Sequence, residues 1–188
     1  MNDTHLTEAQ IVQMAAEAGA RAAMERVEAE RQQDLRDRVD RRLRNTKLLL
    51  RNYRLFKAHV DHAVWESEEE DESPAEILED LMMPGKNNSL IVDSIKRSAT
   101  RTAVIVRHME TMMQLYQAFC STSGAEDDLR RWRVINSLYI SDQKMSVPEL
   151  AAEEKVVVRT IYKDIDAACE RISALMFGID GISTNKRR

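Results

Sequence analysis

The sequence contains few of the residues that α/β enzymes use at phosphate loops and strand-to-helix turns. Its 188 residues include only five glycines and three prolines, and 5% are aromatic. Its apolar runs, such as Leu48-Leu49-Leu50, are far shorter than the roughly 20 residues that a membrane span requires. Residues 1–10 lack the basic-then-apolar start of a secretory signal. We therefore expect neither a transmembrane nor a secreted protein, and a cytoplasmic location.

Cysteine and histidine are also scarce. Cys120 and Cys169 stand 49 residues apart, which fits no zinc or redox motif, so we expect two reduced thiols. His59 and His62 can share a helix face, but a metal site needs further ligands at fixed distance, and the nearby acids lie in an expected loop. We therefore predict no metal site at these histidines.

No phosphate loop, catalytic triad or metal-binding box is present in the sequence. Asp164 and Asp166 are interpreted as surface charges of a helix, because acid/base catalysis needs a cleft that nothing else in the sequence indicates. We therefore expect a protein that is not an enzyme and that carries no cofactor.

The negative charge of the chain is concentrated in one segment. The net charge is −4, but residues 66–80 hold nine acids and no Lys or Arg, so the other 173 residues carry 28 basic and 23 acidic groups, a net of +5. Local fields decide nucleic-acid binding, so the total does not exclude it. The run 66–72 is most simply a solvated linker. A sharper hypothesis is that it masks the protein's own basic DNA-binding face until DNA or polymerase binds.

The first 45 residues predict a long helix. From Thr7 to Asn45 the chain is dense in Ala, Glu, Arg and Gln, with acid-before-base pairs at i,i+4 such as Glu17 and Arg21. The apolar stripe is too narrow to bury one face in a core, so we expect an exposed helix. Two interpretations remain open: a coiled-coil arm that makes homo-oligomers, or a solvated single helix.

The rest of the chain also predicts helices, and no stretch shows the period-two alternation of a strand. We expect an all-α fold with a long exposed N-terminal helix, a central helical region and a C-terminal helix-turn-helix domain. Residues 46–65 predict a second helix, and Ser89 is the expected cap of a long helix that ends near Cys120. A further helix is expected from Glu126 to about Ile140. The predicted division of the chain is 1–65 helical arm and segment, 66–88 acidic linker and short helix, 89–125 central helix, 126–182 DNA-binding domain and 183–188 basic tail.

The most informative stretch begins at Ser146, which caps a helix that has Pro148 in its first turn. Residues 154–156 can turn the chain, and a second helix then holds Arg159 to Ile165. A short helix, a tight turn and a second helix is the plan of the helix-turn-helix. Its expected core is Leu150, Ala151, Val156, Ile161 and Ile165.

The opposite face of the second helix carries the candidate base-reading side chains. Its N-terminal end is expected in the major groove, where Arg pairs with guanine edges, a Thr methyl meets thymine, and Lys or Tyr reaches phosphates. The alternative is an ordinary helical hairpin with solvated basic residues. Three residues depart from the common pattern: Lys155 replaces a turn glycine, Val157 a capping serine, and Glu154 an apolar residue. The candidate face is Val158, Arg159, Thr160, Tyr162 and Lys163.

Three segments resemble the ArpU/RinA-like transcriptional regulators of phages and prophages of Gram-positive bacteria. They are RRWRVINSLYI at 130–140, RTIYKDI at 159–165 and LMFGIDGI at 175–182. The resemblance covers residues 126–182, and residues 45–120 only in general character. It implies a domain like the promoter-reading region four of sigma factors, with Arg159, Thr160 and Lys163 on the recognition helix. It also implies activation of late, packaging or lysis genes in the bacterial host cytoplasm.

The sequence therefore predicts a double-stranded-DNA-binding transcription regulator that acts with bacterial RNA polymerase. The first alternative is a polymerase- or sigma-binding protein that does not touch DNA. The second is a structural helical protein assembled through the 7–45 helix. The expected phosphate contacts are Arg130, Arg131, Arg133, Lys144, Lys155 and the basic tail Lys186-Arg187-Arg188.

Overall fold

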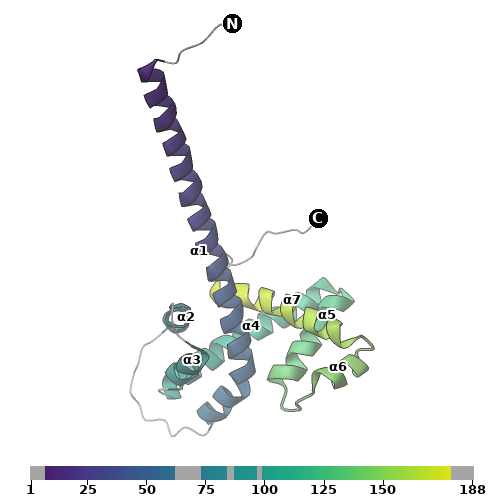
Figure 1. Ribbon diagram of the computed structural model, residues 1–188. Helices are drawn as coiled ribbons and strands as arrows, with labels where there is room; N and C mark the ends of the chain where they lie inside the picture. The colour runs from purple at the N-terminus through teal and green to yellow at the C-terminus, as the bar shows by residue number, and fades with distance from the viewer. Residues whose placement is uncertain (1–6, 62–72, 84–86, 97–98, 179–188) are drawn as a thin grey trace. The chain divides into compact units, whose positions relative to one another are not determined.

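The computed structural model describes residues 7–61, 73–83, 87–96 and 99–178, and among these it contains helices and no strand, which confirms the predicted all-α fold (Figure 1). No helix within these ranges is both long enough and apolar enough to cross a membrane. The elements are α1 Glu8–Asp61, α2 Pro74–Met82, α3 Asn88–Ile95, α4 Ala99–Ser123, α5 Glu126–Ile135, the π-helix η1 Asn136–Ile140, α6 Val147–Glu153 and α7 Val158–Phe177.

The chain forms two compact units, residues 1–38 and residues 39–188. In the first unit the described residues belong almost entirely to α1, and every side chain from 7 to 38 is exposed. Ion pairs along the helix support it, such as Arg21 with Glu17 at 3.7 Å and Arg31 with Glu28 at 3.8 Å. This confirms the expected long exposed helix. Its largest exposed apolar side chains are Ile11, Val12, Met14, Met24, Val27 and Leu35.

The predicted boundary between two helices at residues 45 and 46 is wrong, because α1 continues through it. Asn and Thr disfavour helix interiors when their side chains compete for nearby backbone groups. Here both side chains are buried and bonded without breaking the helix. Asn45 Nδ2 donates to the carbonyl oxygen of Leu81 in α2 at 2.8 Å, and Thr46 Oγ1 donates to the carbonyl oxygen of Arg42 at 2.9 Å.

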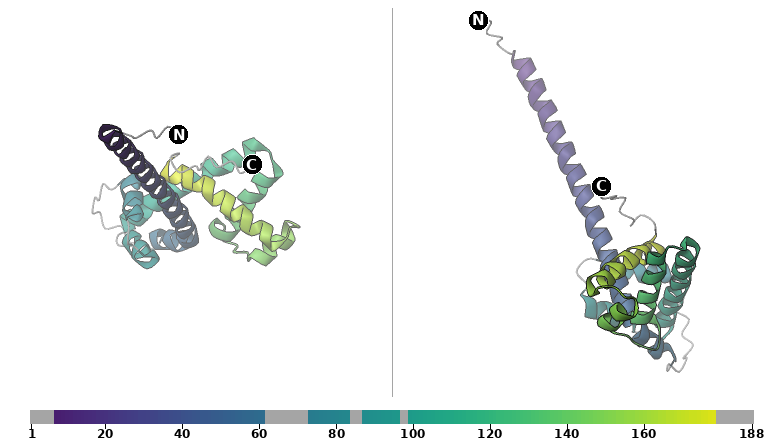
Figure 2. Two further views of the ribbon diagram at one scale, coloured as in Figure 1. Left: turned by 45° about the horizontal axis from the view of Figure 1, so that its top comes forward. Right: turned by 90° about the vertical axis from the view of Figure 1, so that its right-hand side faces the viewer.

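The core of the second unit forms where α4, α5 and α7 pack against one another, with α6 against α7 and α2 and α3 against α4 (Figures 1 and 2). Met109 and Met113 are buried in α4, as expected of core-filling methionines. Both cysteines are free, as predicted, and both are buried. The largest fully buried side chains include Tyr116, Phe56, Leu49, Ile105, Met109 and Ile135.

The single central helix predicted from Ser89 is two helices, α3 and α4. Asn87, not Ser89, caps α3: its Oδ1 accepts from the backbone N–H of Leu90 at 2.9 Å, and the Ser89 hydroxyl donates to the same oxygen at 2.8 Å. Near the start of α4, the buried Thr102 hydroxyl donates to the carbonyl oxygen of Ile95 at 2.9 Å. This bond satisfies a carbonyl at the end of α3, one of those that a helix end leaves without an intrahelical partner.

The short helix expected within residues 66–88 is α2, which begins at Pro74, with Ser73 and Glu76 forming a capping box. The acidic run 66–72 lies outside the described residues. The masking role suggested for this run therefore stays a prediction.

The helix expected from Glu126 to Ile140 has the predicted extent, but its last five residues form the π-helix η1. The guanidinium of Arg54 in α1 lies against the end of this element. It donates to the carbonyl oxygens of Leu138 at 2.8 Å, Ser137 at 3.2 Å and Ser141 at 2.6 Å. Arg54 therefore satisfies carbonyls that the end of a helix leaves without partners.

Candidate nucleic-acid interface

The candidate interface begins at α6, whose start is built as the sequence predicts. The Ser146 hydroxyl accepts from the backbone N–H of Glu149, the Glu149 carboxylate accepts from the backbone N–H of Ser146 at 2.7 Å, and proline occupies the first turn. This capping box directs Leu150 and Ala151 into the core, where both are buried. The small side chain of Ala151 allows α6 and α7 to pack closely.

The turn between α6 and α7 is tight, and Lys155 takes the left-handed backbone conformation at φ 54°. That conformation costs roughly 1 kcal/mol for a residue other than glycine, which is why glycine is common at this place in such turns. Three backbone hydrogen bonds hold the turn: Glu154 N–H to Leu150, Lys155 N–H to Ala152 and Val156 N–H to Ala151, at 2.9, 3.2 and 2.9 Å. The turn therefore forms with lysine where the pattern favours glycine.

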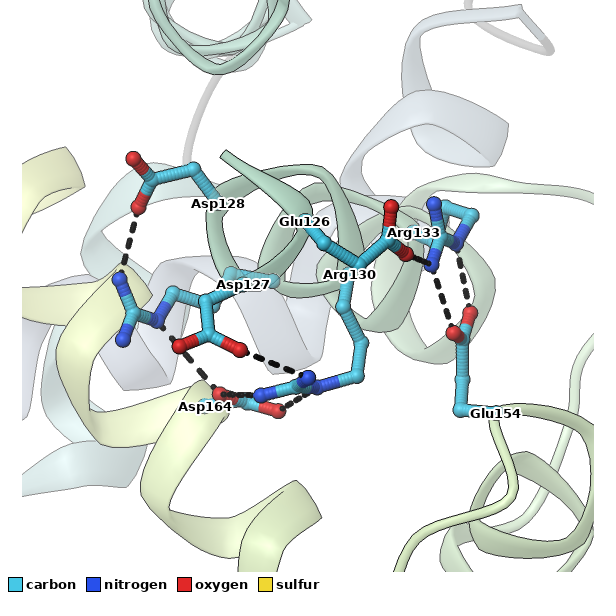
Figure 3. A network of polar contacts seen from close by, with 8 residues as sticks. Glu126, Asp127, Asp128, Arg130, Arg133, Glu154 and Asp164 are labelled. Atoms are coloured by element: carbon cyan, nitrogen blue, oxygen red, sulfur yellow. Dashed lines mark hydrogen bonds and ion pairs between the residues drawn. The ribbon is translucent and has the colours of Figure 1, made fainter. Parts of the chain in front are cut away.

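Glu154, which stands where an apolar residue is common, has a charged partner. Arg133 of α5 donates through Nε and Nη2 to the two oxygens of Glu154, both at 2.7 Å (Figure 3). The same Nη2 also donates to Glu126 at 2.7 Å. The hydrogen bonds and charge of Arg133 lower the pKa of Glu154, and the two carboxylates raise the pKa of Arg133. An ion pair therefore attaches the turn to α5 at a position where, in the common pattern, an apolar side chain does so by packing.

Val157 precedes α7 as its N-cap and makes no side-chain capping bond. Its carbonyl oxygen accepts from the backbone N–H of Thr160 at 2.8 Å, which closes the first turn. The sequence already shows that valine at this position offers no hydroxyl cap. α7 nevertheless begins directly after Val157, the position where the helix-turn-helix pattern has a capping serine. The Val157 side chain is 69% exposed.

The face of α7 predicted to read bases is exposed in the structure. Ile161 and Ile165 are buried, whereas Val158, Arg159, Tyr162 and Lys163 are exposed and Thr160 is half-buried. Val158 and Tyr162 are neighbours at i,i+4, and so are Arg159 and Lys163. The structure therefore brings the five predicted residues together over the first two turns of α7.

Three other predicted phosphate contacts, Arg130, Arg131 and Arg133, are engaged in ion pairs within the domain (Figure 3). Arg130 Nε donates to Asp164 Oδ2 at 2.7 Å, and Arg130 Nη1 lies 2.9 Å from Asp127. Arg131 pairs with Asp128 at 2.7 Å and lies 3.5 Å from Asp164. With the pairs of Arg133, three arginines face five carboxylates, so this cluster offers phosphate no excess positive charge.

The prediction that Asp164 is a surface charge is wrong. Its side chain is 4% exposed and lies on α7 facing α5, where two arginines surround it. A lone aspartate on a helix has no sequence signal for burial, since its partners are more than 30 residues away. Asp166 is exposed as predicted, and its Oδ1 accepts from Lys47 Nζ at 2.7 Å.

Lys144 and Lys155 flank α6 at its two ends, and both are exposed. Neither lysine, nor Arg159 or Lys163, forms an ion pair with another described residue, so all four are available to an anion. The basic tail 186–188 lies outside the described residues.

The described residues add no support for a metal site at the histidines or for a reactive cysteine. No group of three or more potential metal-ligating side chains lies together in the described part of the chain, which does not include His62. Burial raises the pKa of Cys169 to about 12, and it also raises the pKa of Cys120.

Comparison of the chain with protein-family models, with curated proteins and with solved structures finds no significant match.

Proposed function

We propose that this protein is a sequence-specific double-stranded-DNA-binding transcription regulator that reads the major groove with the N-terminal end of α7. The observation that carries the proposal is the exposed face formed by Val158, Arg159, Tyr162 and Lys163 directly after a tight turn. Two features of the structure around this face support the proposal. α6 and α7 share a buried core, and an ion pair between Arg133 and Glu154 attaches the turn to α5. A recognition helix must be held rigidly for its side chains to discriminate bases.

The charges along α7 indicate which part enters the groove. The exposed charges of the first two turns are Arg159 and Lys163, whereas those farther along are Asp166, Glu170 and Arg171, a net of −1. The carboxylates would be repelled by phosphates, so the N-terminal end of the helix is the part that fits against DNA.

In this proposal the side chains divide into two groups. Lys144 and Lys155 contact phosphates and position the domain, while Arg159, Thr160 and Lys163 reach base edges or adjacent groups. Arg130 is excluded from the phosphate contacts, because its guanidinium is bound to Asp164 and Asp127.

The resemblance to phage late-gene regulators supplies the biological part of the proposal. It places the protein in a bacterial cytoplasm, where it activates late genes together with the host RNA polymerase. The exposed apolar side chains of α1 are a candidate contact between copies, and a homo-oligomer would bring a second reading helix to the same operator.

The test is selection of bound duplexes from a random pool by the purified full-length protein at near-physiological salt. We expect one recovered motif, and binding to it should be lost in the double variant R159A/K163A. The matched control is K57A/R107A, which removes two exposed cations from α1 and α4. The four described cations alone, Lys144, Lys155, Arg159 and Lys163, would give a slope of log affinity against log salt of about −3.6, and phosphate contacts by the basic tail would make it steeper. A pool that stays random, or equal losses in both double variants, would refute sequence-specific reading through α7.

A second candidate function is binding to polymerase or sigma factor without contact to DNA, and one observation favours it. Leu115 and Phe119 of α4 and Leu175 of α7 are exposed, and the guanidinium of Arg171 lies 4.3 Å from the centre of the Phe119 ring. Exposed apolar side chains on two packed helices are typical of protein contacts. This candidate predicts that L115A/L175A abolishes polymerase binding while R159A/K163A leaves it intact.

A further inference from the structure

The N-terminal end of α7 exposes more apolar surface than phosphate contacts require. Val157 is 69% exposed, Val158 41% and Tyr162 56%. Serine, threonine, aspartate or asparagine at the position of Val157 would stabilise the helix start, and valine does not. An exposed valine in place of a capping residue therefore stabilises neither the helix nor the described core.

The surroundings of these valines indicate the chemistry of the surface that they would meet. Arg159 and Lys163 follow on the same helix end, and the nearest acid of α7, Asp164, is buried in ion pairs. The complementary surface must therefore be negatively charged and also present small apolar groups. The major groove of DNA meets both conditions, because thymine carries a C5-methyl group there between acceptor-rich base edges.

We propose that Val157 and Val158 are specificity-determining residues that contact thymine C5-methyl groups in the major groove. The proposal rests on the proposed DNA-binding function and adds to it the bases that are read. Arg159 and Lys163 reach the base edges beside them, and the two valines require thymine at the steps that they face.

Deoxyuridine substitution tests the proposal, because uracil keeps the hydrogen-bonding groups of thymine and lacks only the methyl group. Each thymine of the selected duplex is replaced in turn, and affinity for the full-length protein is measured by fluorescence anisotropy at constant salt. We expect binding to weaken about fourfold at each contacted thymine, as the loss of one buried methyl group implies. In V157A and V158A the corresponding deoxyuridine duplex should bind as well as the thymine duplex.

Two further variants separate recognition from folding. V157S supplies a hydroxyl cap, so it should raise the melting temperature and still lose discrimination between thymine and uracil. L90A, which truncates a 53% exposed leucine of α3, should keep full discrimination.

The possible outcomes are distinguishable. Equal affinity of the wild-type protein for the thymine and deoxyuridine forms of a recovered motif overturns the thymine assignment and leaves DNA binding intact. Failure to recover any motif overturns the proposed function and, with it, the assignment. Unchanged discrimination in both V157A and V158A also overturns the assignment, since the methyl groups would then be read by other residues.

Discussion

The ion pair between Asp164 and Arg130 makes a strong prediction about the stability of the domain. Replacing Asp164 by asparagine keeps its size and removes the charge that Arg130 and Arg131 share. The Asp164 side chain is 4% exposed and that of Arg130 is 15% exposed, so solvent replaces little of the lost interaction. Breaking a buried pair by removing one partner costs about 3–5 kcal/mol.

The local geometry places the expected loss at the lower end of that range. Arg130 keeps Asp127 at 2.9 Å and Arg131 keeps Asp128 at 2.7 Å, so neither arginine is left without a carboxylate. Asp127 is 65% exposed and is therefore a weaker partner than Asp164. We expect D164N to lower the free energy of unfolding by about 3 kcal/mol.

Urea unfolding followed by circular dichroism measures this loss, and D166N is the matched control. Asp166 lies on the same helix and also forms an ion pair, with Lys47 at 2.7 Å, but its side chain is 61% exposed. Such a pair contributes about 1 kcal/mol or less. A double-mutant cycle of D164N with R130M should show a coupling energy of about 1–3 kcal/mol.

Two results would refute the reasoning. A loss for D164N no larger than that for D166N would mean that the carboxylate of Asp164 does not hold α7 against α5. Additive losses in the cycle would mean that Asp164 and Arg130 act separately.

Three further predictions concern other parts of the chain. Arg133 lowers the pKa of Glu154 below its ordinary 4.5, so this carboxylate stabilises the fold above about pH 4.5 and loses that contribution as the pH falls through the lowered pKa. The stability difference between wild type and E154Q, measured by urea titration, should therefore be full at pH 7 and shrink progressively as the pH falls below 4.5. With its pKa raised to about 12, Cys169 should resist iodoacetamide at pH 8 until the protein unfolds, and rapid native labelling by mass spectrometry would contradict this. Deleting residues 1–38 should leave the melting temperature of the second unit nearly unchanged and should remove any oligomer seen by light scattering. Deleting residues 1–45 should lower the melting temperature of the second unit, because this deletion removes the buried residues Arg42 and Asn45.

Much of the fold was predictable because its signals are local. The capping box of Ser146 and Glu149 lies within four residues, and the buried and exposed faces of α7 follow from a period of 3.6. The exposed N-terminal helix followed from composition and from its narrow apolar stripe.

The errors in helix boundaries arose where a side-chain hydrogen bond changed the meaning of a local signal. In the sequence, Asn45 and Thr46 indicate a helix boundary. In the structure, the Asn45 side chain donates to a carbonyl oxygen of α2, and the Thr46 hydroxyl donates to a carbonyl oxygen in the preceding turn of α1. The apolar run after Ser89 read as one helix, although the Thr102 hydroxyl completes the end of α3. The Asn45 bond spans 36 residues, so no local pattern announces it, whereas the bonds of Thr46 and Thr102 span only four and seven residues and show that a hydroxyl bond can accompany either a continuing helix or a helix end.

The sequence by itself determined that the chain is helical, where α6 and α7 begin, and which apolar side chains of α7 are buried, because propensity, capping and periodicity act over a few residues. Only the tertiary structure decided which charges are available to an anion. Arg130, Arg131 and Arg133 look like a basic patch in the sequence, yet the fold brings Asp164 and Glu154 against them from 20 to 35 residues away. Since a charge takes its role from its neighbours in space, the same fold that occupies these arginines leaves Arg159 and Lys163 exposed at the end of α7.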